Sequence, residues 1–171
     1  RILRAPVAHA HITAMDTSKA EALPGVVAVV TEADCADSYG VLPIAMNEWA
    51  LARGKVRYRG EPVAAVAAVD VATAQRALDL IEVTYEELPA YFTAEAARAE
   101  GAVQLHEEKP GNIERDVEFD LGDVDKGLAE ADLVREIDVQ CAEVCQVQME
   151  PHAAFAEYDP GREQLTIRPS T

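Results

Sequence analysis

Cysteine, aromatic residues and positive charge are all scarce in this chain of 171 residues. The cysteines, Cys35, Cys141 and Cys145, are odd in number and form no disulfide framework of the kind that small secreted domains use, so a reducing cytoplasm is expected. No basic segment precedes an apolar stretch, and no apolar run approaches the roughly 20 residues that cross a bilayer. These absences argue against a secreted protein and against a membrane as a partner.

The shortage of positive charge has the largest consequence for the choice of partners. Only 15 Lys and Arg stand against 31 Asp and Glu, which gives a net charge of −16 at pH 7. This charge repels phosphate backbones, so nucleic acid is not expected as a partner. The length of 171 residues suits one ordinary domain, or one compact domain with part of a second, and the 49% of apolar residues indicates a globular chain.

What the chain does contain is a complete strand-helix-strand unit from Arg53 to Ala90, RGKVRYRGEPVAAVAAVDVATAQRALDLIEVTYEELPA. After the turn Gly60-Glu61-Pro62, the Val-rich run 63–69 is typical of a buried strand. Asp70 is a candidate helix cap, and the helix has an apolar stripe at i, i+3, i+4 and i+7, namely Ala74, Ala77, Leu78 and Ile81. Residues 82–86 then alternate as a half-buried strand.

Alternation, turn residues and helix caps predict further elements on both sides of this unit. Strands are predicted over residues 7–12, 26–30, 56–58, 113–119, 133–142, 152–158 and 164–168. Short helices are predicted from a capping box of Ser18 and Glu21, from a cap at Thr31, over residues 93–98, and from a cap at Asp123 through Ala131. Residues 38–53 mix Gly, Pro and Asn with large apolar side chains, which favours an irregular excursion that contacts a partner or a substrate channel.

Several segments of the chain carry a family resemblance. Three of these segments lie in the strand-helix-strand unit, namely GEPVAAVAAVD, ATAQRALDLI and EVTYEELPA. A fourth lies at the start of the chain, RILRAPVAHAHITAMDTSKAEALPGVVAVVTEAD. These segments resemble the α/β hammerhead domain of the large, molybdenum-binding subunit of xanthine oxidase and aldehyde oxidase family enzymes. Later in the chain, LGDVDKGLAEADLVRE is similar to the segment that opens the molybdenum-binding region of that family.

The resemblance implies an α+β fold, with an α/β hammerhead domain over residues 1–108 and the first strands of a molybdenum-cofactor-binding domain, truncated, over 109–171. Within the family, LPIAMNEWALARGKVRYRGEPVAAVAAVD and QLHEEKPGNIERDVEF are most similar to the catalytic subunit of 4-hydroxybenzoyl-CoA reductase. That similarity implies reductive dehydroxylation of an aromatic acyl-CoA. A purine, an aldehyde or carbon monoxide stays open as the substrate, and so does a self-standing, non-catalytic assembly module.

The resemblance also implies a parent enzyme with a molybdopterin cofactor and with iron-sulfur and usually flavin centres on partner chains or domains. Arg1 in place of Met, and an end at Thr171 one residue before a family glutamine that lies beside the molybdenum, predict a piece of a longer large subunit. The glycine-rich loop and the metal-proximal glutamate of the family lie further on. No residue here is therefore assigned as catalytic, cofactor-binding or metal-binding, and the isolated chain is expected to be inactive.

Two residue pairs have spacings that permit metal binding, and each also has a structural interpretation. His9 and His11 stand at i and i+2 on a predicted strand, so both are expected on one face. No third ligand has a recognisable spacing, which favours structural histidines. Cys141 and Cys145 are interpreted as core residues rather than ligands of a soft metal, because free cysteine is among the most buried residue types.

Two further segments invite a chemical interpretation. Asp120, Asp123 and Asp125 partly match a calcium loop, but the closing glutamate is absent and a helix cap explains Asp123. The segment Gln148-Met149-Glu150-Pro151-His152 combines an acid with a base, yet it resembles a family segment whose role is structural. Neither segment is assigned a metal or a reaction.

Unpaired strand edges are expected at Ile2-Leu3 and at Leu165-Thr166-Ile167, because the chain is predicted to be cut from a larger sheet structure. Backbone hydrogen bonds at such edges are directional, whereas repulsion from the charge of −16 is screened over about 8 Å at physiological salt. Self-association through these edges is therefore predicted, besides association with the remainder of the large subunit.

Overall fold

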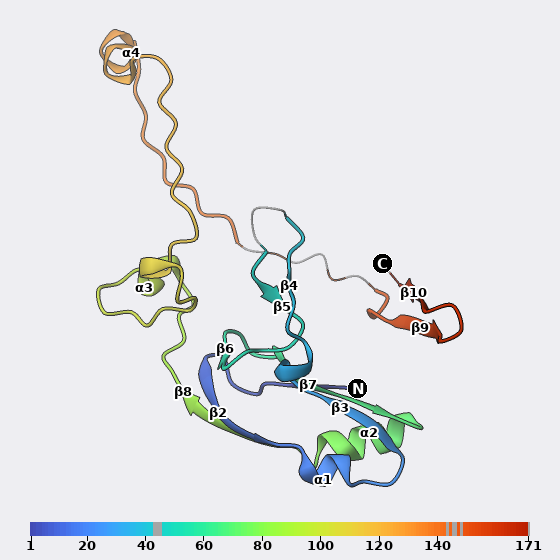
Figure 1. The fold of residues 1–171 in the computed structure, drawn as a ribbon. Helices are drawn as coiled ribbons and strands as arrows, with labels where there is room; N and C mark the ends of the chain where they lie inside the picture. Colours follow the sequence, from blue (N-terminus) through green and yellow to red (C-terminus); the bar gives the residue numbers. More distant parts are fainter. Residues whose placement is uncertain (43–45, 143, 145–146, 148, 171) are drawn as a thin grey trace. The chain divides into compact units, whose positions relative to one another are not determined.

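The computed structural model describes residues 1–42, 46–142, 144, 147 and 149–170 (Figure 1). The chain forms two compact units, unit 1 from Arg1 to Glu118 and unit 2 from Phe119 to Thr171. Helices and strands together give the mixed α and β composition that the sequence predicts. Within the described ranges no helix is long and apolar enough to span a membrane.

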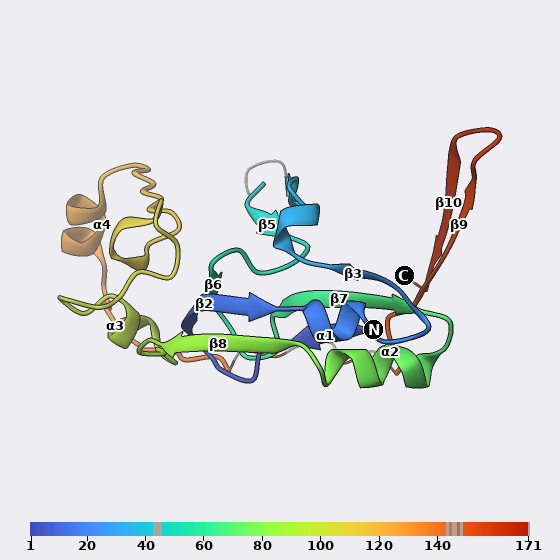
Figure 2. The same ribbon diagram turned by 60° about the horizontal axis from the view of Figure 1, so that its bottom comes forward.

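Unit 1 is built on two antiparallel three-stranded sheets (Figures 1 and 2). The first has the order β1-β7-β3, made by Ile2–Arg4, Pro62–Ala68 and Val26–Val30. The second has the order β6-β2-β8, made by Lys55–Val56, Ala10–Asp16 and Glu82–Glu87. The central strand β7 carries the buried side chains Val63, Ala64 and Val66, as its Val-rich sequence predicts.

The helix α2, Val71–Leu78, packs on the core of unit 1. Its predicted cap is confirmed, because the Asp70 carboxylate accepts a hydrogen bond from the Thr73 amide at 2.7 Å. Ala74, Ala77 and Leu78 are buried, so the apolar stripe faces the core as expected. However, β7 and β8 do not share a sheet: β1 and β3 occupy both edges of β7, and β8 therefore pairs with β2.

Between β2 and β3 the chain makes the short helix α1, Ser18–Glu21. The capping box predicted at Ser18 is wrong, because Ser18 already lies in the helix and it is the hydroxyl of the preceding Thr17 that donates to Glu21. Gly25 then turns the chain with φ of +93°, and a Cβ at this position would lie 3.0 Å from Val69 Cγ2. Both the backbone conformation and the available space therefore require glycine.

The remainder of unit 1 is mostly irregular. The short helix η1, Glu32–Asp34, has the predicted cap at Thr31. Residues 38–53 contain only the short paired strands β4, Ser38–Tyr39, and β5, Glu48–Trp49; residues 43–45 of this excursion lie outside the described ranges. The helix α3, Ala94–Ala97, is capped by Thr93 as predicted, and a single helical turn, η2, spans Pro110–Asn112.

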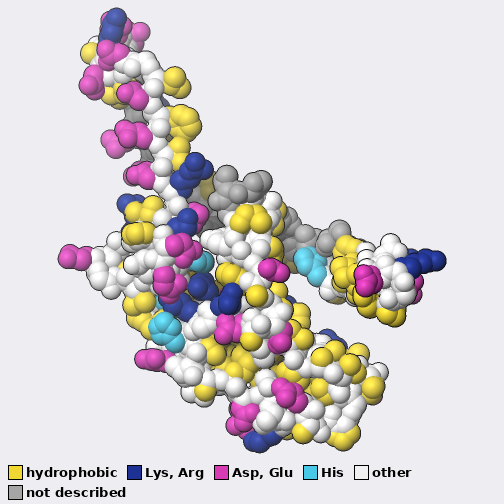
Figure 3. Space-filling view, viewed as in Figure 1, with side chains coloured by type: hydrophobic (Ala, Val, Ile, Leu, Met, Phe, Trp, Pro, Cys, Tyr) yellow, Lys and Arg dark blue, Asp and Glu magenta, His cyan; other side chains and the backbone are white. Residues whose placement is uncertain are grey.

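Unit 2 contains the helix α4, Val124–Glu130, and a hairpin of β9, Ala154–Asp159, with β10, Gln164–Pro169. The hairpin is amphipathic. Cross-strand partners lie on one face of a ladder, and the pairs Tyr158↔Leu165 and Ala156↔Ile167 place apolar side chains together. Tyr158, Leu165 and Ile167 are each more than half exposed, and hydrophobic side chains lie on the surface of this hairpin in Figure 3.

Two predicted strands are absent, and two begin later than expected. Residues 113–119 and 133–142 have no regular structure, and Ile137 is 74% exposed. Their alternation is real, but a strand forms only where a neighbour completes the ladder, and no described residue pairs with either segment. The strand expected over 7–12 is β2 and begins at Ala10, while the one expected over 152–158 is β9 and begins at Ala154.

Candidate functional site

A buried cation on β6 makes the best-defined polar cluster of unit 1. The side chain of Lys55 is only 7% exposed, and its Nζ donates to the Gln104 carbonyl at 3.0 Å and lies 2.6 Å from Glu107 Oε1. Arg57 adds a hydrogen bond from Nε to the Leu105 carbonyl at 3.2 Å and lies 3.7 Å from the other oxygen of Glu107. We call Lys55, Arg57 and Glu107 the clasp, because they join residues 104–107 to β6.

The local fold explains why these groups meet. The backbone of Lys55 pairs with His11 of β2, and the neighbouring Val56 is fully buried, so β6 is held firmly against the sheet. The Arg57 amide donates to Glu61 Oε2 at 2.6 Å, which fixes the chain beyond β6. Hydrogen bonding from Lys55 is the main reason why the pKa of Glu107 lies below its usual range, and the charges of Lys55 and Arg57 add to the effect.

Asn112 organises the segment on the far side of the clasp. Its Oδ1 accepts from the Leu105 amide at 2.7 Å, and its Nδ2 donates to the carbonyls of Ala97 and Val103 at 2.8 and 3.1 Å. The residue adopts φ of +56°, a left-handed conformation that Asn tolerates better than most residues. A hollow of about 280 Å³ lies beside it, with Tyr91, Leu105 and Lys109 among its lining residues.

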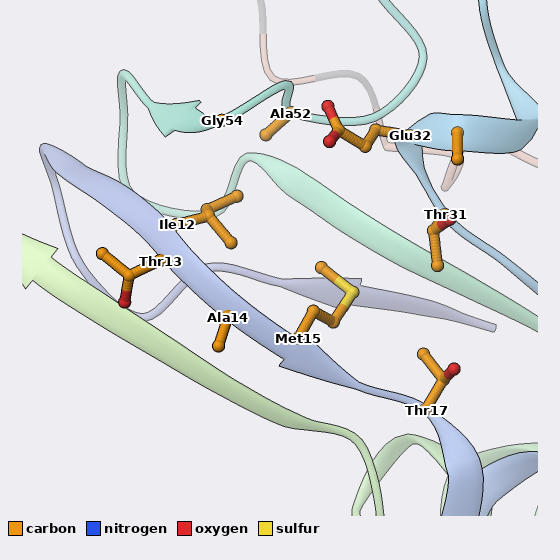
Figure 4. A pocket seen from close by; sticks show the side chains of 10 residues that line it. Ile12, Thr13, Ala14, Met15, Thr17, Thr31, Glu32, Ala52 and Gly54 are labelled. Atoms are coloured by element: carbon orange, nitrogen blue, oxygen red, sulfur yellow. The ribbon is translucent and has the colours of Figure 1, made fainter.

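A larger hollow, of about 410 Å³, lies along β2 (Figure 4). Its lining comes from four consecutive residues of β2 with Thr17, from η1 with Thr31, and from the segment that precedes β6. Ile12 and Met15 point into it, whereas Thr13 points away toward β8. On one edge β2 pairs with β8, and on the other edge it pairs with β6 only at Ala10 and His11. Within the described residues, the remainder of that second edge has no strand partner and borders this hollow.

The structure separates His9 from His11. His9 precedes β2 and is 2% exposed, whereas His11 is exposed on the strand, so the prediction that both share one face is wrong. The alternation that placed them together does not hold because the chain bends at residues 6–9. His9 Nδ1 donates to the Pro89 carbonyl at 2.7 Å, and the buried Nε2 has no hydrogen-bond partner among the described residues.

The other candidate residues do not assemble into a site. Cys141 is exposed rather than packed in a core, because its segment forms no strand; Cys145 and Gln148 lie outside the described ranges. The Asp123 carboxylate accepts from the Lys126 amide at 2.9 Å, which confirms the helix cap. Glu150 and His152 are exposed. Among the described residues no three His, Cys, Asp or Glu side chains are grouped to hold a metal ion.

Comparison with known proteins identifies both parts of the chain. Residues 1–89 match the family model described as the aldehyde oxidase and xanthine dehydrogenase a/b hammerhead domain. Residues 105–171 match the molybdopterin cofactor-binding domain. The chain therefore belongs to the aldehyde oxidase and xanthine dehydrogenase family, with the hammerhead domain followed by the start of the cofactor-binding domain.

Individual relatives agree with this assignment. The chain is 33% identical to a probable hypoxanthine oxidase XdhD of Escherichia coli O157:H7, over all of this chain and 22% of that protein. It is 34% identical to the nicotinate dehydrogenase large molybdopterin subunit of Eubacterium barkeri, over 99% of this chain and 39% of the relative. The crystal structure of quinoline 2-oxidoreductase from Pseudomonas putida 86 superposes with a TM-score of 0.82 at 34% identity, over all of this chain and 23% of that one. The chain thus spans between about a fifth and two fifths of these relatives.

The clasp and the larger hollow were missed by reasoning from the sequence. Lys55 and Glu107 lie far apart in the chain, and each looks like a solvated surface charge when it is considered alone. The one available signal was the position of Lys55 directly before the predicted strand 56–58, whose first residue, Val56, is apolar. A lysine so placed can bury its stem while its ammonium group reaches a partner.

Proposed function

We propose that this chain is the hammerhead domain and the beginning of the cofactor-binding domain of the large subunit of a molybdopterin-dependent oxidoreductase. The observation that carries the proposal is the match of two family models, in this order, along one chain. The domain boundary, at 108/109, is part of the proposal. The remainder of the large subunit is its first partner, and iron-sulfur and flavin subunits are further partners in a cytoplasmic complex.

We infer that the described residues do not by themselves form a site for the molybdenum cofactor. The described residues of unit 2 are exposed almost throughout, and the one orphaned buried polar atom among the described side chains, His9 Nε2, belongs to unit 1. A cofactor site needs buried, converging donors that are held in place by a supporting shell. We therefore propose a structural role for this chain and assign none of the described residues as catalytic, cofactor-binding or metal-binding.

The finer proposal is a 4-hydroxybenzoyl-CoA reductase-like parent. In that reaction an aromatic acyl-CoA loses its phenolic hydroxyl group: two electrons and two protons enter, the carbon–oxygen bond breaks, and water leaves. The support is the similarity of residues 42–70 and 104–119 to that branch of the family. Electrons for the reduction would come from the partner subunits.

Hydroxylation of a nitrogen heterocycle or a purine is the second candidate. The relatives' names favour it, since they include a probable hypoxanthine oxidase, a nicotinate dehydrogenase and a quinoline 2-oxidoreductase. Substrate choice is made by pocket residues, and the hollows of unit 1 are not shown to be part of that pocket.

The test is to express the complete large subunit with its partner subunits and to assay both reactions. Formation of benzoyl-CoA from 4-hydroxybenzoyl-CoA with a reduced electron donor would support the finer proposal. Reduction of an artificial acceptor with hypoxanthine, nicotinate or quinoline, without benzoyl-CoA formation, would favour the second candidate. A complete subunit that carries no molybdenum by elemental analysis and supports neither reaction would refute the oxidoreductase proposal.

A further inference from the structure

The larger hollow of unit 1 combines an apolar wall with hydroxyl and carboxylate side chains whose remaining hydrogen-bond capacity is as acceptors. The apolar part comes from Ile12, Met15 and Ala52, and Figure 4 shows the first two directed into the space. Its volume of about 410 Å³ lies within the range of small-ligand pockets. The chemistry of an occupant is therefore decided by the polar side chains.

Each hydroxyl around the hollow already donates its proton elsewhere. Thr17 Oγ1 donates to Glu21, Thr31 Oγ1 donates to Asp34 Oδ2 at 3.2 Å, and Thr13 Oγ1 donates to the Thr84 carbonyl at 3.2 Å. A hydroxyl has one proton and two lone pairs, so these groups have only acceptor capacity left. The carboxylates of Glu21 and Asp34 add negative charge behind the hydroxyls.

Glu32 is the charged group of the lining, and its partner is weak. Arg53 Nε lies 3.7 Å from Glu32 Oε2, which is too long for a hydrogen bond, and the Arg53 guanidinium carbon stacks over Trp49 at 4.3 Å. Among the described residues this ion pair with Arg53 is the one polar contact of the Glu32 carboxylate. The hollow therefore presents a carboxylate that lacks a close donor.

We propose that this hollow receives the side chain of an Arg or Lys from the rest of the large subunit. An aliphatic stem fits the wall of Ile12 and Met15, and a cationic head meets Glu32 and the hydroxyl oxygens of Thr17 and Thr31. The net charge of −16 complements such a partner. The choice of occupant rests on the proposed function, since the relatives extend well beyond this chain.

Methyl NMR of the 171-residue chain, titrated with n-butylguanidinium, tests the chemistry of the hollow. We expect saturable shifts of the Ile12, Met15 and Thr31 methyl signals, with about fivefold weaker binding of the neutral isostere n-butylurea. Glu32→Gln is expected to weaken binding of the cation about fivefold. Glu86→Gln, which removes an exposed acid from β8, is the matched control and should leave the affinity unchanged within a factor of two.

The outcomes separate the chemistry of the hollow from the source of its occupant. Absent or unsaturable shifts, equal binding of n-butylurea, or an unchanged affinity in the Glu32→Gln variant would overturn the proposal. In the complete large subunit the same methyl signals should no longer respond to n-butylguanidinium, because the subunit's own side chain fills the hollow. An equal response there would refute the proposed occupant, whereas the oxidoreductase assignment is tested by its own assays.

Discussion

Removing the carboxylate of the clasp should destabilise unit 1 more than its surface position suggests. Glu107 is 66% exposed, but its partner Lys55 is 7% exposed, so Glu107→Gln leaves a nearly buried ammonium with the Gln104 carbonyl as its remaining hydrogen-bond partner. A buried charge that loses its partner costs several kcal/mol, and solvent screening at the exposed end reduces this. We expect a loss of about 1–2 kcal/mol in the free energy of unfolding.

Urea unfolding followed by circular dichroism measures this loss. With an m value of about 1.5 kcal/mol per M, the midpoint should fall by about 1 M. Glu108→Gln is the matched control, because it removes a neighbouring acid whose one ion pair among the described residues is the 3.8 Å contact with His106; a change below about 0.5 kcal/mol is expected. Equal midpoints for the two variants would refute the reasoning from the burial of Lys55.

The clasp also predicts a pH dependence with a definite sign. The pKa of Glu107 is lowered from its usual 4.5 in the folded protein, chiefly by the hydrogen bond from Lys55, so the unfolded chain binds the proton more readily. The stabilisation is therefore complete above about pH 5.5 and is lost as the pH falls below 4.5 through the folded-state pKa. The midpoint difference between the natural chain and the Glu107→Gln variant should shrink as the pH falls through this window; a difference that does not change with pH down to acid unfolding would contradict the assignment.

Three further predictions concern unit 1, and a fourth concerns the strand edges. Asp70→Ala should lower the thermal midpoint of unfolding. Asp70→Ser should largely preserve it, because a serine hydroxyl can also accept a hydrogen bond from the Thr73 amide; equal losses would contradict a capping role. His9→Asn keeps a donor near the Pro89 carbonyl and should be more stable than His9→Gln, and ¹⁵N NMR should show the hydrogen on Nδ1; a hydrogen on Nε2 would exclude this bond. Gly25→Ala should lower the free energy of unfolding by about 2–3 kcal/mol. Gly54→Ala should lower it by only about 1 kcal/mol, because Gly54 also has a positive φ but a Cβ there would meet no atom within 4 Å; similar losses for the two variants would show that the Val69 side chain moves aside at little cost. Small-angle scattering should detect concentration-dependent dimers through the edges of β1 and β10, and strictly monomeric scattering at high concentration would disprove this.

Local patterns allowed accurate prediction where neighbours in the sequence decide the structure. The cap at Asp70, the stripe of Ala74, Ala77 and Leu78, and the cap at Asp123 were predicted because each depends on residues three or four positions apart. The family resemblance identified the hammerhead and the start of the cofactor-binding domain, which the two family models confirm.

Features that depend on distant residues escaped prediction. The pairing of β8 with β2 rather than β7 follows from competition among strands, which no local pattern encodes. The alternation in 133–142 resembles that of a true strand, but whether a partner strand is present decides its structure. The burial of His9 depends on its contact with Pro89, which lies 80 residues later in the chain. The clasp likewise joins two distant segments, and no pattern in either segment indicates the other as its partner.

During synthesis on the ribosome, the antiparallel pairing of early with late strands delays the folding of unit 1. Ile2 pairs with Ala65, and Asp16 pairs with Glu82, so β1 and β2 leave the ribosome long before their partners exist. At roughly 5–20 residues per second, β1 waits between about 3 and 13 seconds for β7. Over that interval its apolar residues are open to other nascent chains, and a chaperone that shields extended segments would raise the yield of folded protein. The order of translation, rather than the final stability, determines when this chain is most prone to aggregate.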